Sequence, residues 1–345
     1  ALGCWAPATR AALQFDVFLG YDNLVREANW FPVACEIFND GPTFTGVFEL
    51  TSEAGGRGQA RRYVLELPTN TRKRFVIPVF GSGGRYGVWS ARLLDQHGRT
   101  RGEAPNLRPR REVSWETVVL GALPRTFGGL PAMPEVKTSR NDLQPAVARL
   151  QTDYFPDNPL ALEGLDALYL NSEKALDLKV NQVNALLAWL NGGGHLIVGV
   201  EQPGDVNGTP WLRNLLPCQL TGVATIADQT AFHDWLTAFR SETRHSQPAP
   251  PSPPRAGGKQ IAVSSANPYA TLGTDLAFTR GALPVAECVV RGGTTVLSSS
   301  GRPVVIEAPR GRGKVTVLAF SPEREPFRSW KNRPWFWARL LAIPP

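Results

Sequence analysis

The sequence lacks any run of about 20 consecutive apolar residues, which is the length that a membrane-spanning helix needs. It also opens without the charged and then apolar segments of a secretory signal. No stretch recurs at a fixed period, so we do not expect a solenoid or a propeller. A chain of 345 residues, 42% of them hydrophobic, is instead expected to form about two domains with ample apolar residues for a core.

The usual signatures of catalytic and metal centres are missing as well. The four histidines and four cysteines show neither His-x-x-x-His nor Cys-x-x-Cys spacing. The sequence contains no G-x-S-x-G turn and no phosphate-binding loop. We therefore predict no metal ion, no cofactor and no catalytic residue from these motifs.

The four cysteines permit three full disulfide pairings, and the sequence does not choose among them. Cys35 alternates with Val33 and Ile37, so we expect it to point into a core as a small apolar side chain. Cys4 follows a short segment similar to a lipoprotein cleavage site, but an ordinary cysteine near a terminus is the better interpretation. The cysteines are Cys4, Cys35, Cys218 and Cys288.

Basic residues outnumber acidic ones, and the net charge is +7. The excess lies in short runs inside or beside turn-rich segments, without interleaved aromatic residues, so the runs indicate solvated edges of a β-sandwich. We do not expect nucleic acid as a partner. Contact of the basic runs with anionic lipid headgroups ranks between a nucleic-acid surface and a solvated sheet edge. The runs are Arg57 with Arg61 and Arg62, Arg72-Lys73-Arg74, Arg108 with Arg110 and Arg111, and Arg310 with Arg312.

The first third of the chain is a series of short strand-like segments separated by turn signals such as Asn39-Asp40-Gly41-Pro42. This spacing predicts an antiparallel β-sandwich over residues 1–112. Trp30 could cap a functional groove, but an aromatic residue at the core or its rim is the favoured interpretation. The expected strands are Phe15–Leu19, Trp30–Phe38, Thr45–Thr51, Arg62–Leu67, Arg72–Phe80 and Tyr86–Asp95.

A strand, a helix, three glycines and a second strand follow one another between Leu165 and Glu201. Ala167–Leu170 and His195–Val200 are short apolar runs, which suit strands buried on both faces. Between them we expect a helix with Asp177 as its N-cap and Gly192-Gly193-Gly194 at its end. This order predicts a parallel crossover. The expected apolar stripe of the helix is Leu178, Val180, Val183, Leu186, Leu187 and Leu190.

Residues 113–345 are predicted to form a three-layer α/β unit around a mainly parallel sheet. Its first strands are expected at Trp115–Leu120 and Val147–Leu150, and helical segments at Leu212–Pro217 and Phe232–Phe239. The Pro-rich segment Gln247–Gly258 is expected to be a loop. The tryptophans near the C-terminus could stack on a sugar, but their spacing favours a helix that packs on the sheet. Late strands are expected at Gln260–Ser264, Thr294–Ser298, Val304–Ala308 and Lys314–Ala319.

Ligands of such sheets bind beyond the carboxyl ends of the strands, and polar residues follow both strands of the crossover. A small ligand of the α/β unit is therefore expected near these residues. The alternative for Glu201 is structural, because it could cap the following turn or pair with an arginine. The candidate ligand-binding residues are Asn171, Ser172, Glu201, Gln202 and Asp205.

Residues 165–199, with LDALYLN and QVNALLAWLNGGGHLIVG, resemble the class I glutamine amidotransferase-like fold, in particular its non-catalytic branch in bacterial envelope proteins. The hairpin Gly311-Arg312-Gly313-Lys314-Val315 and the aromatic tail from Pro326 to Trp337 add to the resemblance, which covers roughly the last two thirds of the chain. The phrase from Trp30 to Leu50 is similar to the immunoglobulin-like domains that accompany this fold. The resemblance implies a flavodoxin-like or amidotransferase-like sheet after an immunoglobulin-like sandwich.

Active class I amidotransferases carry their nucleophilic cysteine in a G-x-C-x-G turn just after the strand. Here the matching residues are Gly199-Val200-Glu201-Gln202-Pro203, so the resemblance implies an inactive fold. We expect the chain to be an exported, non-catalytic part of a bacterial envelope protein, with a binding or scaffolding role. Its partner would be an envelope protein or an envelope ligand, in the periplasm or at the cell surface. Two alternatives stay open: a hydrolase that uses Glu201 or Asp205, and a carbohydrate-binding module.

The first residue, Ala1, is not an initiator methionine, which a trimmed export signal or an engineered boundary would explain. Relatives in the same branch commonly carry a membrane helix beyond the α/β domain. We therefore expect that any membrane attachment is made through segments outside residues 1–345.

Overall fold

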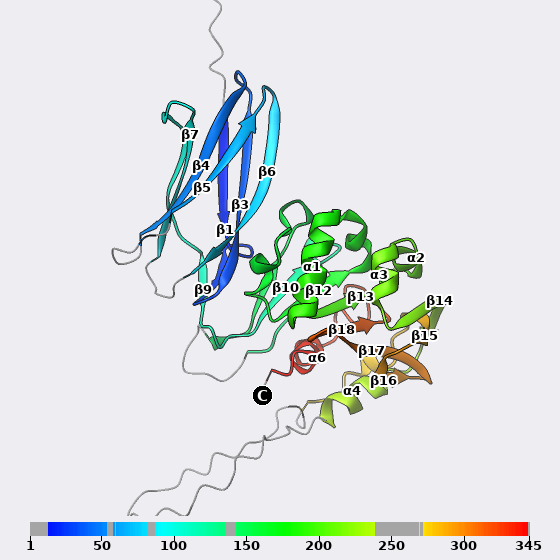
Figure 1. The fold of residues 1–345 in the computed structure, drawn as a ribbon. Coiled ribbons are helices and arrows are strands. Elements are labelled where there is room, and N and C mark those ends of the chain that lie inside the picture. The colour runs from blue at the N-terminus through cyan, green and yellow to red at the C-terminus, as the bar shows by residue number, and fades with distance from the viewer. Residues whose placement is uncertain are drawn as a thin grey trace, which may run out of the picture.

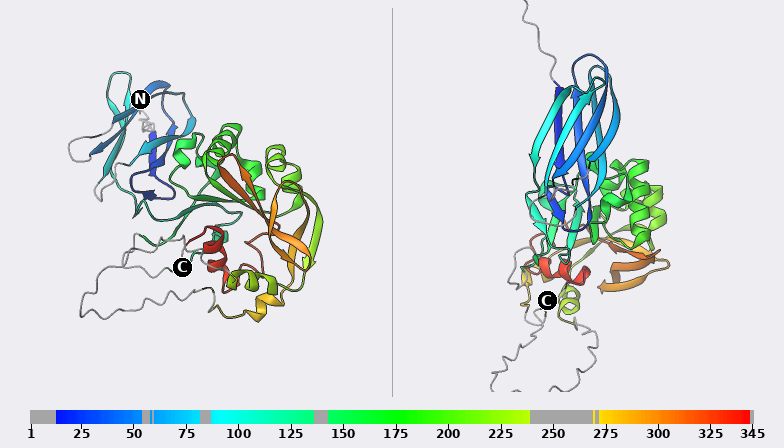
Figure 2. Two further views of the ribbon diagram at one scale, coloured as in Figure 1. Left: turned by 60° about the horizontal axis from the view of Figure 1, so that its bottom comes forward. Right: turned by 60° about the vertical axis from the view of Figure 1, so that its left-hand side comes forward.

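The protein is represented by a computed structural model that describes residues 13–53, 58, 60–81, 87–135, 143–238, 269 and 272–343. An elongated, strand-rich N-terminal part leads into a second part in which helices flank a sheet (Figure 1). The right-hand view of Figure 2 shows the N-terminal strands extending away from the helical part. Among the described residues, no helix is both long and apolar enough to cross a membrane.

The N-terminal part contains two antiparallel sheets, which agrees with the predicted all-β, sandwich-like region. Val33, Cys35 and Ile37 are fully buried between the sheets, as their alternation predicted for Cys35. One sheet has the order β1 (Leu13–Leu19), β3 (Trp30–Asn39), β6 (Thr71–Phe80). The other has the order β5 (Ala60–Leu67), β4 (Phe44–Glu53), β7 (Val88–Asp95), β8 (Thr100–Leu107).

Trp30 lies at the rim of the sandwich, where its ring packs edge-on against Phe80 and the Arg61 guanidinium lies over it. Strand β8 was not predicted, because Thr100–Leu107 alternates weakly and is mostly polar. The strand forms by antiparallel pairing with β7, which supplies its backbone partners.

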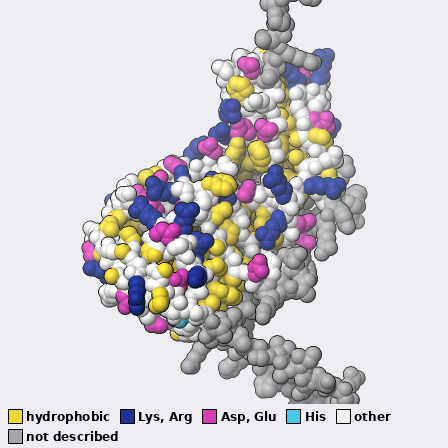
Figure 3. Space-filling view, turned by 180° about the vertical axis from the view of Figure 1, so that it is seen from behind, with side chains coloured by type: hydrophobic (Ala, Val, Ile, Leu, Met, Phe, Trp, Pro, Cys, Tyr) yellow, Lys and Arg dark blue, Asp and Glu magenta, His cyan; other side chains and the backbone are white. Residues whose placement is uncertain are grey.

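Two buried glutamates neutralise part of the basic surface of the sandwich. Glu49 forms ion pairs with Arg62 and Arg92, which lie on the two strands that flank its own. On the other sheet, Glu36 pairs with Arg72 and Arg74. On the face of the molecule shown in Figure 3, basic and acidic side chains are interspersed over both parts. Two of the predicted basic runs, those with Arg62 and with Arg72 and Arg74, therefore have acidic partners within the protein.

A seven-stranded sheet forms the centre of the second part. Its first five strands are parallel to one another, the sixth is antiparallel to the fifth, and the seventh is antiparallel to the sixth. The order across the sheet is β11 (Ala146–Arg149), β10 (Val119–Leu123), β12 (Ala167–Asn171), β13 (His195–Gly199), β18 (Gly313–Leu318), β17 (Arg302–Arg310), β16 (Thr294–Ser299). The parallel pairing of β12 with β13 confirms the predicted crossover.

Helices cover both faces of this sheet (Figure 1). Along β12, Leu168 and Leu170 pack in the cluster that contains α1, whereas Ala167 and Tyr169 pack in the cluster that contains α6. This alternation explains why the strands are apolar at every position. The helices are α1 (Val180–Gly192), α2 (Pro203–Asn207), α3 (Pro210–Leu215), α4 (Thr230–Thr237), α5 (Leu276–Thr279) and α6 (Arg333–Leu340).

Two further pairs of strands were not predicted. β14 (Cys218–Ile226) and β15 (Leu283–Val290) form an antiparallel ribbon beside the seven-stranded sheet. β2 (Leu24–Arg26) and β9 (Arg111–Val113) form a short parallel pair between the sandwich and the α/β part. In both pairs the two strands are far apart in the sequence, so no local sequence pattern predicts their pairing.

The start of α1 differs from the prediction. Its N-cap is Lys179, whose backbone N–H donates to the Gln182 side chain at 2.9 Å, whereas Asp177 ends a short 3-10 helix, η5 (Ser172–Asp177). The predicted stripe is therefore too long at this end. Leu178 precedes the helix, and Val180 is 75% exposed.

The first strand of the parallel sheet also begins later than expected. The prediction was Trp115–Leu120, but Trp115 is exposed and β10 begins at Val119. Thr117 N–H donates to the Ser114 carbonyl, which closes a turn just before the strand. The helix expected at Phe232–Phe239 is α4, which begins two residues earlier, at Thr230. The expected strand Gln260–Ser264 and the expected loop Gln247–Gly258 lie outside the described residues.

Polar contacts, both buried and exposed, join the two parts of the chain. The Tyr21 hydroxyl donates to the Ala161 carbonyl at 2.8 Å and accepts from Gly164 N–H at 3.2 Å. Arg26 forms an ion pair with Asp166 at 3.1 Å. The apolar cluster under α1 also continues into the core of the sandwich. The sandwich and the α/β part are therefore held together by both packing and hydrogen bonds.

Candidate functional site at the carboxyl edge of the sheet

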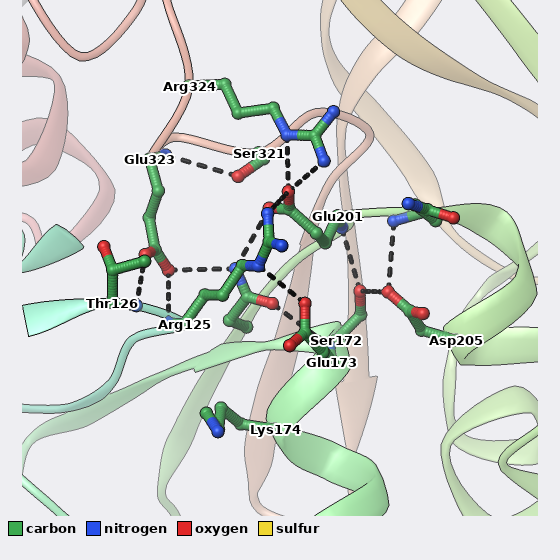
Figure 4. A network of polar contacts seen from close by, with 12 residues as sticks. Arg125, Thr126, Ser172, Glu173, Lys174, Glu201, Asp205, Ser321, Glu323 and Arg324 are labelled. Carbon is green, nitrogen blue, oxygen red and sulfur yellow. Dashed lines mark hydrogen bonds and ion pairs between the residues drawn. The ribbon is translucent and has the colours of Figure 1, made fainter.

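Four parallel strands end at one edge of the sheet, and polar residues follow each of them (Figure 4). β12 ends in Asn171 and is followed by Ser172, and β13 is followed by Glu201. These are residues that the sequence predicted at this edge. The adjoining strands β10 and β18 add four residues that it did not predict: Arg125, Ser321, Glu323 and Arg324.

Glu201 lies at the centre of this group, and its side chain is only 1% exposed. One carboxylate oxygen, Oε1, accepts from Arg125 Nη1 at 2.9 Å and from Arg324. The other oxygen, Oε2, accepts from Asn171 Nδ2 at 3.3 Å. The carboxylate therefore receives charged or polar donors on both oxygens.

These contacts keep Glu201 ionised. Burial alone would raise the pKa of the Glu201 carboxyl, but hydrogen bonds from Ser321 and Asn171 and the positive charge of Arg324 outweigh it. The net result is a pKa below the ordinary value of a glutamate. A carboxylate in this state is a poor proton donor near neutral pH.

Glu323 forms a second buried centre beside the first. Its Oε1 accepts from the Tyr169 hydroxyl at 3.0 Å, from Asn171 Nδ2 at 2.9 Å and from Arg125 N–H at 2.9 Å. Its Oε2 accepts from Thr126 N–H at 3.2 Å. Glu323 thus holds the segment after β10, and with it the Arg125 side chain that pairs with Glu201.

The remaining candidate residues are joined by a separate set of hydrogen bonds. The Ser172 hydroxyl donates to Asp205 Oδ2 at 2.8 Å and accepts from Glu201 N–H at 2.8 Å. Gln202 N–H donates to the same Asp205 oxygen at 3.1 Å. Asp205 lies in the first turn of α2, so these bonds stabilise the start of that helix.

The structure thus brings all five candidate residues to one edge but engages their polar atoms with one another. Among the described residues, no group of three or more His, Cys, Asp or Glu side chains is arranged to hold a metal ion. The described His195 lies at the opposite, amino end of β13, where Nε2 contacts Thr316 Oγ1 at 2.8 Å. His195 is therefore not in position to act as a base for a nucleophile at this edge.

A cavity of about 260 Å³ opens beside the Glu201 centre. Glu201, Gln202, Ser321 and Arg324 form its polar side. The facing wall comes from the β14–β15 ribbon and is apolar. The lining residues from the ribbon are Val223, Leu283, Pro284, Val285 and Ala286.

The sequence carried a signal for the missed residues. Ligands lie beyond the carboxyl ends of parallel strands, and this holds for every parallel strand of the sheet, not for β12 and β13 alone. Lys314–Ala319 was predicted as a strand, so Ser321, Glu323 and Arg324 could have been included. Arg125 was missed because the first strand was expected to end at Leu120, whereas β10 continues to Leu123.

Residues 12–106 match a family described as a domain of unknown function (DUF8726), which covers the sandwich and not the site. No curated protein matches the chain. Similar solved structures include the CARDB domain of the PF1109 protein from Pyrococcus furiosus, at 11% identity and a TM-score of 0.22, covering 28% of this chain and 81% of that one.

Two enzymes are also among the similar structures. One is the Pseudomonas fluorescens alkylpurine DNA glycosylase AlkC, at 12% identity and a TM-score of 0.21, covering 28% of this chain and 31% of that one. The other is a Paenibacillus cycloisomaltooligosaccharide glucanotransferase, at 11% identity and a TM-score of 0.22. The match covers 53% of this chain and 27% of that one. This chain spans less than a third of either enzyme. Similarities at these TM-scores do not define the fold or function of this chain.

Proposed function

We propose that this chain is a non-catalytic binding or scaffolding region of an exported bacterial envelope protein. It would combine an immunoglobulin-like sandwich with a class I amidotransferase-like domain. The observation that supports a non-catalytic role is the state of Glu201. The residue at the position of the amidotransferase nucleophile is a buried carboxylate held by Arg125 and Arg324.

The hydrolase alternative has less support. A general acid needs a proton near neutral pH, and the neighbours of Glu201 lower its pKa. Asp205 is engaged as the acceptor of Ser172 and of the Gln202 backbone. Chemistry at either carboxylate would first have to break contacts that stabilise the sheet edge.

The carbohydrate-binding alternative relied on the aromatic residues near the C-terminus. Trp330, Phe336 and Trp337 are buried in the cluster on the α6 face of the sheet. Stacking on a sugar requires an exposed ring face, so these side chains favour the packing role.

The cavity between Glu201 and the ribbon is the surface that we propose for binding. Val223 contributes to its wall and is 63% exposed, so its apolar side chain is accessible to a partner. Apolar walls with a few polar groups on one side are typical of binding sites. We propose that an apolar segment of an envelope protein enters this cavity.

A matched pair of variants tests the binding surface. Val223→Glu places a charge in the cavity, whereas Val289→Glu places one on the same ribbon outside it, at a position that is 51% exposed. The purified wild-type protein and both variants would be used to capture partners from envelope extracts, with quantification by mass spectrometry. We expect at least one partner that Val289→Glu captures in the same amount as the wild-type protein. Val223→Glu should bind this partner at least about tenfold more weakly, a difference of about 1.4 kcal/mol in binding free energy. Equal capture by the two variants would contradict the proposed surface.

The absence of catalysis is tested separately. We expect no release of ammonia from glutamine above the rate without protein, because the turn after β13 carries no thiol. Ammonia release that Cys218→Ala or Cys288→Ala abolishes would show that the protein is an enzyme with its nucleophile elsewhere.

Fractionation of the source cells tests the proposed location outside the cytoplasm.

A further inference from the structure

We propose that Cys218 and Cys288 form a disulfide bond when the protein meets a disulfide oxidant. This inference concerns the ribbon formed by β14 and β15 and does not depend on the proposed function. The sequence left the pairing of the cysteines open, whereas strand pairing brings these two together.

The register of the ribbon places the two cysteines diagonally across from each other. Cys218 lies opposite Val290, and Cys288 lies opposite Leu220, so each is two positions from the partner of the other. Residues two apart on a strand point to the same face, and diagonal neighbours in an antiparallel pair have Cα atoms about 7–8 Å apart, with their Cβ atoms closer. A disulfide bond spans about 4.4–6.8 Å between Cα atoms, so the bond forms with a small shift of the two strands toward each other. Both side chains pack in the apolar cluster that contains Leu220.

The two thiols also contact each other, and their environments differ. The Cys218 thiol donates to the Cys288 sulfur, which raises the pKa of Cys218, with burial adding to the effect. The same hydrogen bond lowers the pKa of Cys288, although burial opposes it. The Cys288 thiol in turn donates to the Pro303 carbonyl oxygen at 3.6 Å. Because Cys288 is the less buried of the two and the more easily ionised, it is the thiol that would react first.

Thiol–disulfide exchange with a small disulfide such as oxidised glutathione accounts for every atom and electron. The Cys288 thiolate attacks one sulfur of the oxidant, whose S–S bond breaks and releases one thiolate. Cys218 then loses its proton to solvent, and its thiolate attacks Cys288 Sγ and expels the second thiolate. The two cysteines lose two protons and two electrons, and the oxidant becomes two thiols.

The third described cysteine is not expected to take part. Cys35 is fully buried in the core of the sandwich, and burial raises the pKa of its thiol. It lies on β3, which belongs to a different sheet from the ribbon. Cys35 therefore serves as the internal control in the experiment.

The test is to equilibrate the wild-type protein in oxidised and in reduced glutathione, block free thiols with N-ethylmaleimide and map the peptides by mass spectrometry. We expect a cross-linked peptide that joins Cys218 to Cys288 only in the oxidised sample. The native protein should then carry two fewer blocked thiols than its reduced form. Oxidation should also raise the Tm, because the bond closes a long loop of the unfolded chain.

Variants identify the order of the two steps. Cys218→Ser should stop the reaction at a mixed disulfide on Cys288, whereas Cys35→Ser should still form the Cys218–Cys288 bond. The proposal is wrong if the oxidised wild-type protein keeps both thiols free, or if either cysteine pairs with Cys4. The wild-type readout alone decides this question, so a variant that fails to fold does not affect it.

Discussion

Arg125 and Glu201, which are 76 positions apart in the sequence, form an ion pair with 2.9 Å between Nη1 and Oε1. Arg125 follows β10 and Glu201 follows β13, so the pair spans the carboxyl edge of the parallel sheet across β12. A second arginine, Arg324, reaches the same carboxylate from the segment after β18. The segment after β13 therefore holds a buried carboxylate that is paired with arginines from the segments after β10 and β18.

Replacement of Glu201 by glutamine is expected to destabilise the protein. The change preserves shape but leaves Arg125 and Arg324 without their shared counter-charge, and both arginine side chains are about two-fifths exposed. We therefore expect a loss of about 1–3 kcal/mol, below the value for a fully buried pair. The measurement is the free energy of unfolding from urea denaturation.

Glu173→Gln is the matched control for this change. Glu173 Oε2 lies 2.7 Å from Arg125 Nε, but its side chain is 41% exposed. Its replacement should cost less than about 1 kcal/mol, as expected for a surface pair. Unchanged stability of Glu201→Gln together with weaker partner binding would instead support a ligand role for Glu201.

Tyr21→Phe is expected to weaken the junction between the sandwich and the α/β part. The change removes a buried hydroxyl and leaves the Ala161 carbonyl and Gly164 N–H without that partner. A loss of about 1–3 kcal/mol follows from the desolvation of these groups. Tyr63→Phe, on the partly buried surface of the sandwich, is the control and should change stability by less than about 0.5 kcal/mol. Equal effects of the two variants would contradict the proposed role of the Tyr21 hydroxyl.

Two of the three glycines at the end of α1, Gly192 and Gly194, are expected to differ in their tolerance of alanine. A Cβ at Gly192 would meet no atom within 4 Å, so Gly192→Ala should stabilise the helix end by up to about 1 kcal/mol. A Cβ at Gly194 would lie 2.5 Å from the Trp189 ring, so Gly194→Ala should cost about 1–3 kcal/mol. Thermal denaturation of the two variants measures the difference, and a lower Tm for Gly192→Ala than for Gly194→Ala would contradict it.

His195 is expected to make the protein sensitive to mild acid. Burial, with a smaller contribution from the charge of Lys314, lowers the pKa of His195 to about 3. In the unfolded chain the imidazole has a pKa of about 6.5, so below that pH the unfolded state binds the additional proton. The stability contribution is therefore complete above pH ~6.5 and decreases toward pH ~3, by about 1.4 kcal/mol per pH unit.

Urea denaturation between pH ~6.5 and ~5, above the range where carboxylates titrate, measures this slope. His195→Gln should flatten it, whereas His97→Gln, in the exposed turn of the β7–β8 hairpin, should leave it unchanged. An unaltered slope in His195→Gln would mean that another group controls the acid response.

Much of the fold could be predicted from local patterns. Alternation marked six strands of the sandwich, and the apolar runs and glycines around α1 marked the parallel crossover. Such patterns are visible because neighbours in the sequence share one face of an element. The exact end of a helix or strand is harder to predict from local patterns. Asp177 is the better N-cap by residue type, yet α1 begins after Lys179, whose backbone N–H donates to the Gln182 side chain.

The sequence by itself determined that polar residues follow β12 and β13, and that no thiol follows β13. Only the tertiary structure decided that Arg125, Glu323 and Arg324 contact Asn171 or Glu201, because the neighbours of a strand depend on the order of the sheet. The pairing of β14 with β15, and with it the contact between Cys218 and Cys288, has the same origin. Contacts between distant segments form only when the whole chain folds, so no local pattern of residues records them.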